Sequence, residues 1–232
     1  MREKIIAGNI YHVLNRGVDK RKIFLNDQDY FRFIHDLFEF NDVNPINNNF
    51  YKFNNNNVSA RRYIEKSQPR KLLVDILAFC LMPNHYHLLV KPRSDNGLFK
   101  FIKRLNMGYS RYFNDKNKRR GALFEGRYKS IAIKDESHLI HLPYYIHLNP
   151  LDINFLEWRD REIKDYKKAI NFLENYRWSS HLDYIGQKNF PSITSREFLL
   201  EFFGGTEGYK KSINNWLKDI EVDKIKGFIL ED

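Results

Sequence analysis

The sequence predicts an α+β fold in which helices cover an antiparallel sheet. Hydrophobic residues make up 42% of the 232 residues, which is enough for a sizeable core. Segments whose apolar residues alternate as in a strand are interspersed with segments whose apolar residues recur at helical spacing. The middle of the chain also holds two apolar runs joined by a short turn, a pattern typical of neighbouring antiparallel strands.

The first half of the chain supplies a strand, a helix and a hairpin. Residues 9–15 read as a strand, and residues 27–40 follow with apolar side chains at helical spacing. Residues 72–81 and 85–91 are apolar runs on either side of a Met-Pro-Asn turn. These two runs are therefore predicted to pair as a hairpin.

The second half continues with a helix, a strand and a further helix. Residues 98–113 carry an apolar stripe, residues 127–133 alternate as a half-exposed strand, and residues 135–148 begin another helix. The resulting order, β-α-β-β-α-β-α, describes a ferredoxin-like α+β sandwich with an antiparallel sheet and helices on one face.

Two boundaries follow from composition. Residues 41–70 are rich in Asn, and such polar, low-complexity sequence is interpreted as an insertion or long loop. We expect one domain over residues 1–150 that contains this insertion. A helical C-terminal extension over residues 151–232 is expected to pack on or beside it.

Several classes of protein are excluded by what the sequence lacks. The lone Cys80 has no partner for an internal disulfide, and no zinc-finger spacing or nucleotide-binding loop occurs. No apolar run approaches the roughly 18 residues of a membrane span. A soluble, cytoplasmic protein is expected.

Positive charge is concentrated in one part of the chain. The formal net charge is +10, and between Lys100 and Lys134 there are 11 basic and two acidic residues, 11 − 2 = +9. A block of one sign favours a polyanionic partner, with nucleic acid ahead of an acidic membrane surface and a plain solvated face as the alternative. The candidate DNA-binding residues in it are Lys100, Lys103, Arg104, Arg111, Lys118, Arg119, Arg120, Arg127 and Lys129.

A histidine pair is the first candidate for chemistry. His85 and His87 are two residues apart on a predicted strand, so both imidazoles point to the same face. Two such imidazoles are able to fill two positions around a divalent ion. His-x-His also occurs by chance, so this spacing alone does not establish a metal site.

A tyrosine and an asparagine are the second candidate. Tyr145 and Asn149 are four residues apart, which places a phenol and an amide on one helix face, whereas Tyr144 is turned about 100° away. A tyrosine, a metal and a basic helix suit transesterification at a DNA phosphodiester. A core aromatic followed by a helix stop is the structural alternative. His12 and Arg16 stay open between lining the site and a structural role.

Four motifs occur together in one order. They are MPNHYHLLVKP (residues 82–92), GALFEGRYKS (121–130), YYIHLNP (144–150) and YRWSSHLDYIG (176–186). In content and order they resemble the single-tyrosine transposases of the His-hydrophobic-His class, and most of all the REP-associated tyrosine transposases and similar insertion-sequence-type proteins.

The resemblance implies a catalytic domain, a cofactor and a substrate. Residues 1–150 would form the ferredoxin-like catalytic domain, which cleaves single-stranded DNA near a hairpin with a divalent metal ion, Mg or Mn. His85 and His87 match the metal-binding pair, Tyr145 the nucleophile and Asn149 the residue that completes the metal site. The relatives include monomers and dimers, so a homodimer is possible. Two alternatives stay open: a domesticated protein that binds DNA hairpins without productive cleavage, and a hydrolase that uses water as nucleophile.

Overall fold

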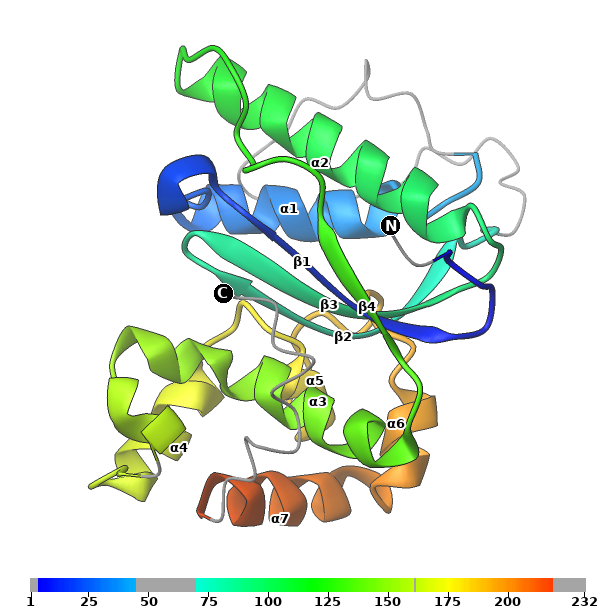
Figure 1. Ribbon diagram of the computed structural model, residues 1–232. Helices are drawn as coiled ribbons and strands as arrows, with labels where there is room; N and C mark the ends of the chain where they lie inside the picture. Colours follow the sequence, from blue (N-terminus) through cyan, green and yellow to red (C-terminus); the bar gives the residue numbers. More distant parts are fainter. Residues whose placement is uncertain (1–3, 45–69, 161, 219–232) are drawn as a thin grey trace.

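A computed structural model of the protein describes residues 4–44, 70–160 and 162–218. Its centre is a four-stranded antiparallel sheet in the order β2-β3-β1-β4, shown in Figure 1. The strands are β1 (Ile10–Arg16), β2 (Val74–Met82), β3 (His85–Pro92) and β4 (Lys129–Ile133). Helix α1 (Asp27–Glu39) connects β1 to β2, and helix α2 (Gly97–Lys116) connects β3 to β4. The predicted α+β, ferredoxin-like fold is confirmed.

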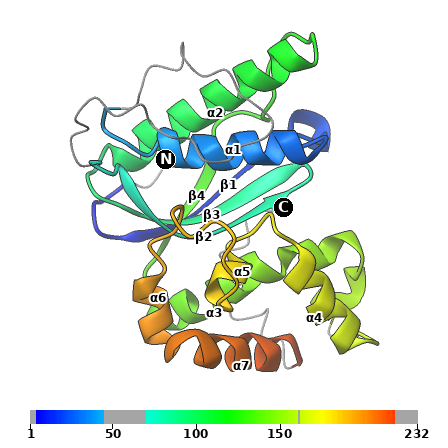
Figure 2. The same cartoon turned by 180° about the vertical axis from the view of Figure 1, so that it is seen from behind.

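Helices cover both faces of this sheet. Helices α1 and α2 lie on one face, as predicted. The prediction was wrong for the third helix, because α3 (Glu136–Leu148) lies on the other face with the C-terminal helices, where its apolar side chains share their buried cluster (Figures 1 and 2). The C-terminal elements are η3 (Asn149–Ile153), η4 (Leu156–Asp160), α4 (Tyr166–Asn175), α5 (His181–Tyr184), α6 (Glu197–Phe202) and α7 (Gly205–Lys218).

Each strand contributes to two hydrophobic clusters because its side chains alternate between the faces. On β3, Tyr86 and Leu88 belong to the cluster beneath α1 and α2. Leu89 belongs to the cluster beneath α3 and the C-terminal helices, where Trp158 and Tyr209 are also buried. The His85 and His87 positions share the face of Leu89. The candidate site is therefore built between the sheet and α3.

The turn between β2 and β3 is fixed by the backbone around it. Met82 pairs with His85 across a two-residue turn, and the Pro83 carbonyl accepts hydrogen bonds from the Ile23 and Phe24 amides at 2.8 and 3.1 Å. The Gly17 amide donates to the Asn84 carbonyl at 2.8 Å. This bracing holds the start of β3, and with it the histidine pair, in one register.

The structure does not test two of the predictions, the Asn-rich insertion and the domain boundary at residue 150. Most of the Asn-rich insertion predicted over residues 41–70 lies outside the described residues. The division at residue 150 stays a prediction, although Trp158 and Tyr209 share one buried cluster with α3 and the sheet. Within the described part of the chain, no helix combines the length and the apolar character needed to cross a lipid bilayer.

Candidate active site

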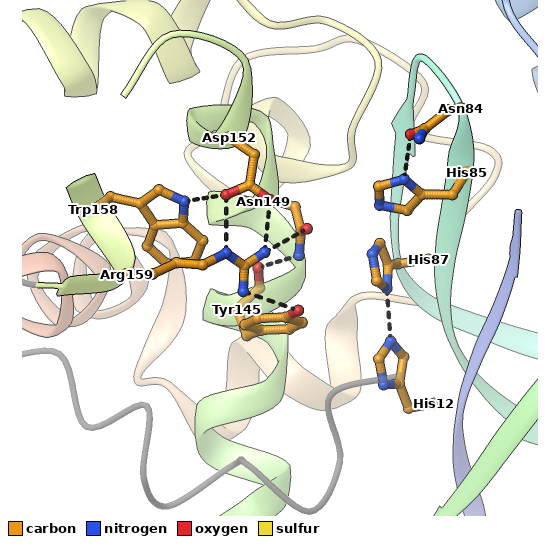
Figure 3. Close-up of polar contacts among 9 residues, drawn as sticks. All are labelled: His12, Asn84, His85, His87, Tyr145, Asn149, Asp152, Trp158 and Arg159. Atoms are coloured by element: carbon orange, nitrogen blue, oxygen red, sulfur yellow. Dashed lines mark hydrogen bonds and ion pairs between the residues drawn. The ribbon is translucent and has the colours of Figure 1, made fainter. Parts of the chain in front are cut away.

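The two histidines of β3 point toward α3 (Figure 3). Their ring centroids are 4.9 Å apart, and His87 is fully buried while His85 is 9% exposed. His85 Nδ1 lies 2.7 Å from the side-chain oxygen of Asn84, which only accepts, so Nδ1 carries the proton. A neutral His85 then presents the lone pair of Nε2, the form that a metal ion requires.

A third histidine, His12 of β1, extends this row across the sheet. Its Nε2 lies 2.9 Å from His87 Nδ1, and the two rings stack at 5.1 Å. For His87 Nε2 to bind a metal, Nδ1 of His87 has to carry the proton and donate it to His12. His12, which the sequence left open, is thus placed to fix the tautomer of His87.

Helix α3 brings Tyr145 and Asn149 to the same place. The Tyr145 ring lies 6.0 Å from the His87 ring and 6.4 Å from the His12 ring, and its side chain is fully buried. Asn149 donates from Nδ2 to the Tyr145 carbonyl at 2.9 Å, so the direction of its amide is set by the helix. The predicted four-residue spacing therefore gives two groups that face the histidine row (Figure 3).

Tyr144 lies in different surroundings. Its ring packs against Phe203, Tyr209 and Trp216 at 5.1, 5.7 and 6.1 Å. Burial raises the pKa of Tyr144 to about 12, partly offset by a hydrogen bond with Ser212. Tyr144 thus serves the packing between α3 and the C-terminal helices.

Arg159 is a site residue that the sequence reasoning missed. Its Nη1 donates to Tyr145 Oη at 3.2 Å, and its Nη2 donates to Asn149 Oδ1 at 3.4 Å. Asp152 accepts two hydrogen bonds from the same guanidinium, and Trp158 Nε1 donates to Asp152 at 2.5 Å. Arg159 stands on η4, outside the basic block and between acidic residues, so neither charge nor periodicity singled it out.

The predicted metal ligands form a suitable donor set. Two imidazole nitrogens come from β3, and the amide oxygen comes from Asn149, the C-cap of α3 and the first residue of η3. No group of three or more His, Cys, Asp or Glu residues suited to a metal occurs among the described residues, so the amide is needed to complete the set. This set of nitrogen and oxygen ligands is compatible with Mn²⁺, and less so with Mg²⁺, which prefers oxygen.

The basic block is divided by the sheet. Lys100, Lys103, Arg104 and Arg111 lie on α2, which covers the face opposite to α3. Arg104 is half-buried and donates to the Asp42 carbonyl at 2.6 Å, so it braces the end of α1. The other three are exposed.

The remaining candidate DNA-binding residues lie between the end of α2 and the start of β4. Arg119 donates to Asn114 Oδ1 and to the Ala122 carbonyl at 2.7 and 3.0 Å, which closes the loop after α2. Lys129 pairs with Leu14 of β1, which in turn pairs with His87 of β3. Because directly paired residues share a face, Lys129 lies on the same face as the histidine row. Lys118, Arg120 and Arg127 are exposed in the loops between α2 and β4.

Comparisons with known proteins bear on this site. A family model described as "Transposase IS200 like" matches residues 48–149, a stretch that includes the histidine pair, Tyr145 and Asn149. No match was found among curated proteins. A solved structure of a REP-associated tyrosine transposase bound to a REP hairpin aligns with 84% of this chain and 90% of that chain, at 13% identity and a TM-score of 0.46.

Proposed function

We propose that the chain is an IS200-like transposase, and that it cuts and rejoins single-stranded DNA through a phosphotyrosine formed at Tyr145. One observation carries the assignment of this tyrosine. The Tyr145 ring, from α3, lies 6.0 Å from the ring of His87, from β3, whereas Tyr144 points into the packing of the C-terminal helices.

The reaction is a balanced exchange of ester bonds. The Tyr145 oxygen forms a bond to phosphorus while one bond between phosphorus and a backbone oxygen breaks. The phenol gives up its proton, and the departing oxygen takes one up. A divalent ion, Mg²⁺ or Mn²⁺, held by His85, His87 and Asn149 would supply Lewis acidity at the phosphate. The energy of the broken ester is kept in the new one, so the reverse exchange rejoins DNA.

The exposed cations of α2 are proposed to bind the DNA backbone. Lys100, Lys103 and Arg111 line a hollow of about 1040 Å³ together with Phe99 and Met107, which are 53% and 63% exposed. Lysine and arginine attract phosphates, and an exposed aromatic side chain is able to stack on an unpaired base. A DNA hairpin, the substrate that the sequence motifs imply, offers both a duplex backbone and unpaired bases.

A second candidate function is supported by the burial of the nucleophile. The Tyr145 side chain is fully buried, so the phosphate reaches Oη only after a neighbouring group moves. A protein that binds DNA hairpins without productive cleavage would not need an accessible Tyr145 Oη. Cytoplasmic location and a homodimer stay predictions for either function.

One experiment tests the proposed reaction. The protein is incubated with labelled single-stranded hairpin DNA and Mn²⁺ or Mg²⁺, and the products are separated under denaturing conditions. The proposal predicts a labelled protein band that requires the metal ion and is absent in Tyr145→Phe. Tyr144→Phe is the matched control and should retain most of the adduct, because it removes a neighbouring phenol oxygen outside the site.

Two other outcomes have definite meanings. DNA binding without any adduct in the wild-type protein would support the hairpin-binding alternative. DNA that is cut equally well by the wild type and by both Phe variants would support a hydrolase with water as nucleophile.

A further inference from the structure

Arg159 is held at the phenol oxygen of Tyr145 from several directions. Nη1 donates to Oη at 3.2 Å, and the guanidinium carbon lies 5.2 Å from the Tyr145 ring centroid and 4.7 Å from that of Trp158. Asp152 accepts from Nε at 3.0 Å and from Nη2 at 2.7 Å. A two-point bond of this kind fixes the plane of the guanidinium.

Asp152, which accepts two hydrogen bonds from Arg159, is itself fixed by a further hydrogen bond. Trp158 donates from Nε1 to Asp152 Oδ1 at 2.5 Å, and Asp152 stands on η3, three residues after Asn149. The Arg159 and Asp152 side chains are 26% and 24% exposed, so the pair is partly shielded from water. This pair therefore keeps one orientation, which is what a site needs in order to act on a charge that develops during a reaction.

On the premise of the proposed function, we propose that Arg159 is a catalytic residue that binds a non-bridging oxygen of the scissile phosphate. When Oη bonds to phosphorus, the non-bridging oxygens of that phosphorus become its close neighbours. They then come within hydrogen-bond reach of a donor that already lies 3.2 Å from Oη. The hydrogen bond donated by Nη1–H then shifts from the phenol oxygen to a phosphate oxygen. Arg159 neither gains nor loses a proton.

The chemistry of a guanidinium suits this role. Negative charge builds up on the phosphate oxygens as the new ester bond forms, and a fixed cationic donor stabilises it. A guanidinium is not deprotonated in proteins, so Arg159 keeps its positive charge throughout. A lysine at this position would keep the charge but lose the two-point bond to Asp152, so it should replace arginine only in part.

The test compares two substrates that differ only at the scissile phosphate. One is a normal hairpin oligonucleotide. In the other, a methylphosphonate at the scissile position replaces a charged non-bridging oxygen with a neutral methyl group. Adduct formation is measured at saturating DNA for the wild type, Arg159→Lys and Arg159→Ala. Arg93→Ala is the matched control, because Arg93 also makes a two-point bond to an aspartate, Asp75, at the far end of β3.

The proposal predicts a loss that depends on the substrate. On normal DNA, Arg159→Ala should lower the adduct rate about 100-fold, with Arg159→Lys in between and Arg93→Ala near wild type. On the methylphosphonate, where the charge is already gone, Arg159→Ala and the wild type should differ by less than about 5-fold. Thermal unfolding shows whether each variant is folded.

Three results would overturn the proposal. An equal loss on both substrates would make Arg159 a structural residue that only supports Tyr145. A faster reaction of Arg159→Ala would make it a cover over the buried phenol. A wild-type protein that forms no adduct with either substrate would remove the proposed function, and the phosphate contact with it.

Discussion

The two sides of the sheet differ in the exposure of their polar groups. Toward α3, His12, His87, Tyr145 and Asn149 are all fully buried. Toward solvent, α2 presents Lys100, Lys103 and Arg111 on exposed side chains. Chemistry requires groups fixed in one geometry, whereas affinity for a polyanion requires only accessible charge. Cleavage and DNA affinity should therefore be separable by mutation.

The largest effect is expected from the histidine pair. His85→Ala and His87→Ala should each lower adduct formation by more than about 1000-fold, because each removes a ligand of the proposed metal ion. Hairpin affinity, measured by fluorescence anisotropy, should stay within about 3-fold of wild type because most of the proposed phosphate contacts lie on α2. A variant that cleaves at the wild-type rate would show that the metal site is wrongly assigned.

Substitution of His12 should change the affinity for the metal ion and not the affinity for DNA. His12→Leu removes the acceptor for the His87 Nδ1 proton, so Mn²⁺ affinity should fall about 10- to 100-fold. His12→Gln keeps an acceptor oxygen and should recover part of the loss. Titration calorimetry with Mn²⁺ and no DNA measures both. Equal Mn²⁺ affinity in all three proteins would contradict the tautomer assigned to His87.

Substitutions on the exposed surface of α2 should change DNA affinity but not the rate of adduct formation. Replacing Lys100, Lys103 and Arg111 together with Ala removes three phosphate partners, so the slope of log affinity against log salt should flatten by about 2 for single-stranded DNA. Arg104 is excluded because it braces the Asp42 carbonyl. The adduct rate at saturating DNA should not change. An unchanged slope would place the DNA on another surface.

A smaller effect is expected for acid stability on the α3 side. Burial lowers the pKa of His181 to about 4 and holds the pKa of His147 well below its usual range. Both stay neutral in the folded protein, whereas the unfolded chain takes up protons as pH falls below about 6.5. Stability should therefore be intact above pH 6.5 and fall by about 2 kcal/mol per histidine at pH 5.

Urea unfolding at pH 7 and pH 5 measures this loss. His181→Gln, which cannot be protonated, should show a smaller difference between the two pH values than the wild type. An identical difference in the variant would mean that His181 does not contribute.

Local patterns in the sequence were sufficient for part of this arrangement. The two-residue spacing of His85 and His87 predicted a shared face, and the four-residue spacing to Asn149 favoured Tyr145 over Tyr144. The structure places all of these residues accordingly. The alternation of strands with helices likewise predicted the fold, since each element depends on neighbours in the chain.

Other features depend on contacts between distant segments. His12 meets His87 only through the pairing of β1 with β3, and Arg159 meets Tyr145 only because η4 folds back on α3. The charge block looked like one surface in the sequence, yet the sheet separates α2 from the candidate site. No periodicity encodes on which face of a sheet a connecting helix lies.

The identity of the tyrosine that carries the DNA is the most direct test of the proposed active site. The covalent adduct formed by the wild-type protein is digested with nuclease and protease, and tandem mass spectrometry locates the nucleotide within the peptide that contains both adjacent tyrosines. We expect the nucleotide on Tyr145, which faces the histidine row. A nucleotide on Tyr144, whose ring packs against Phe203 and Trp216, would contradict it.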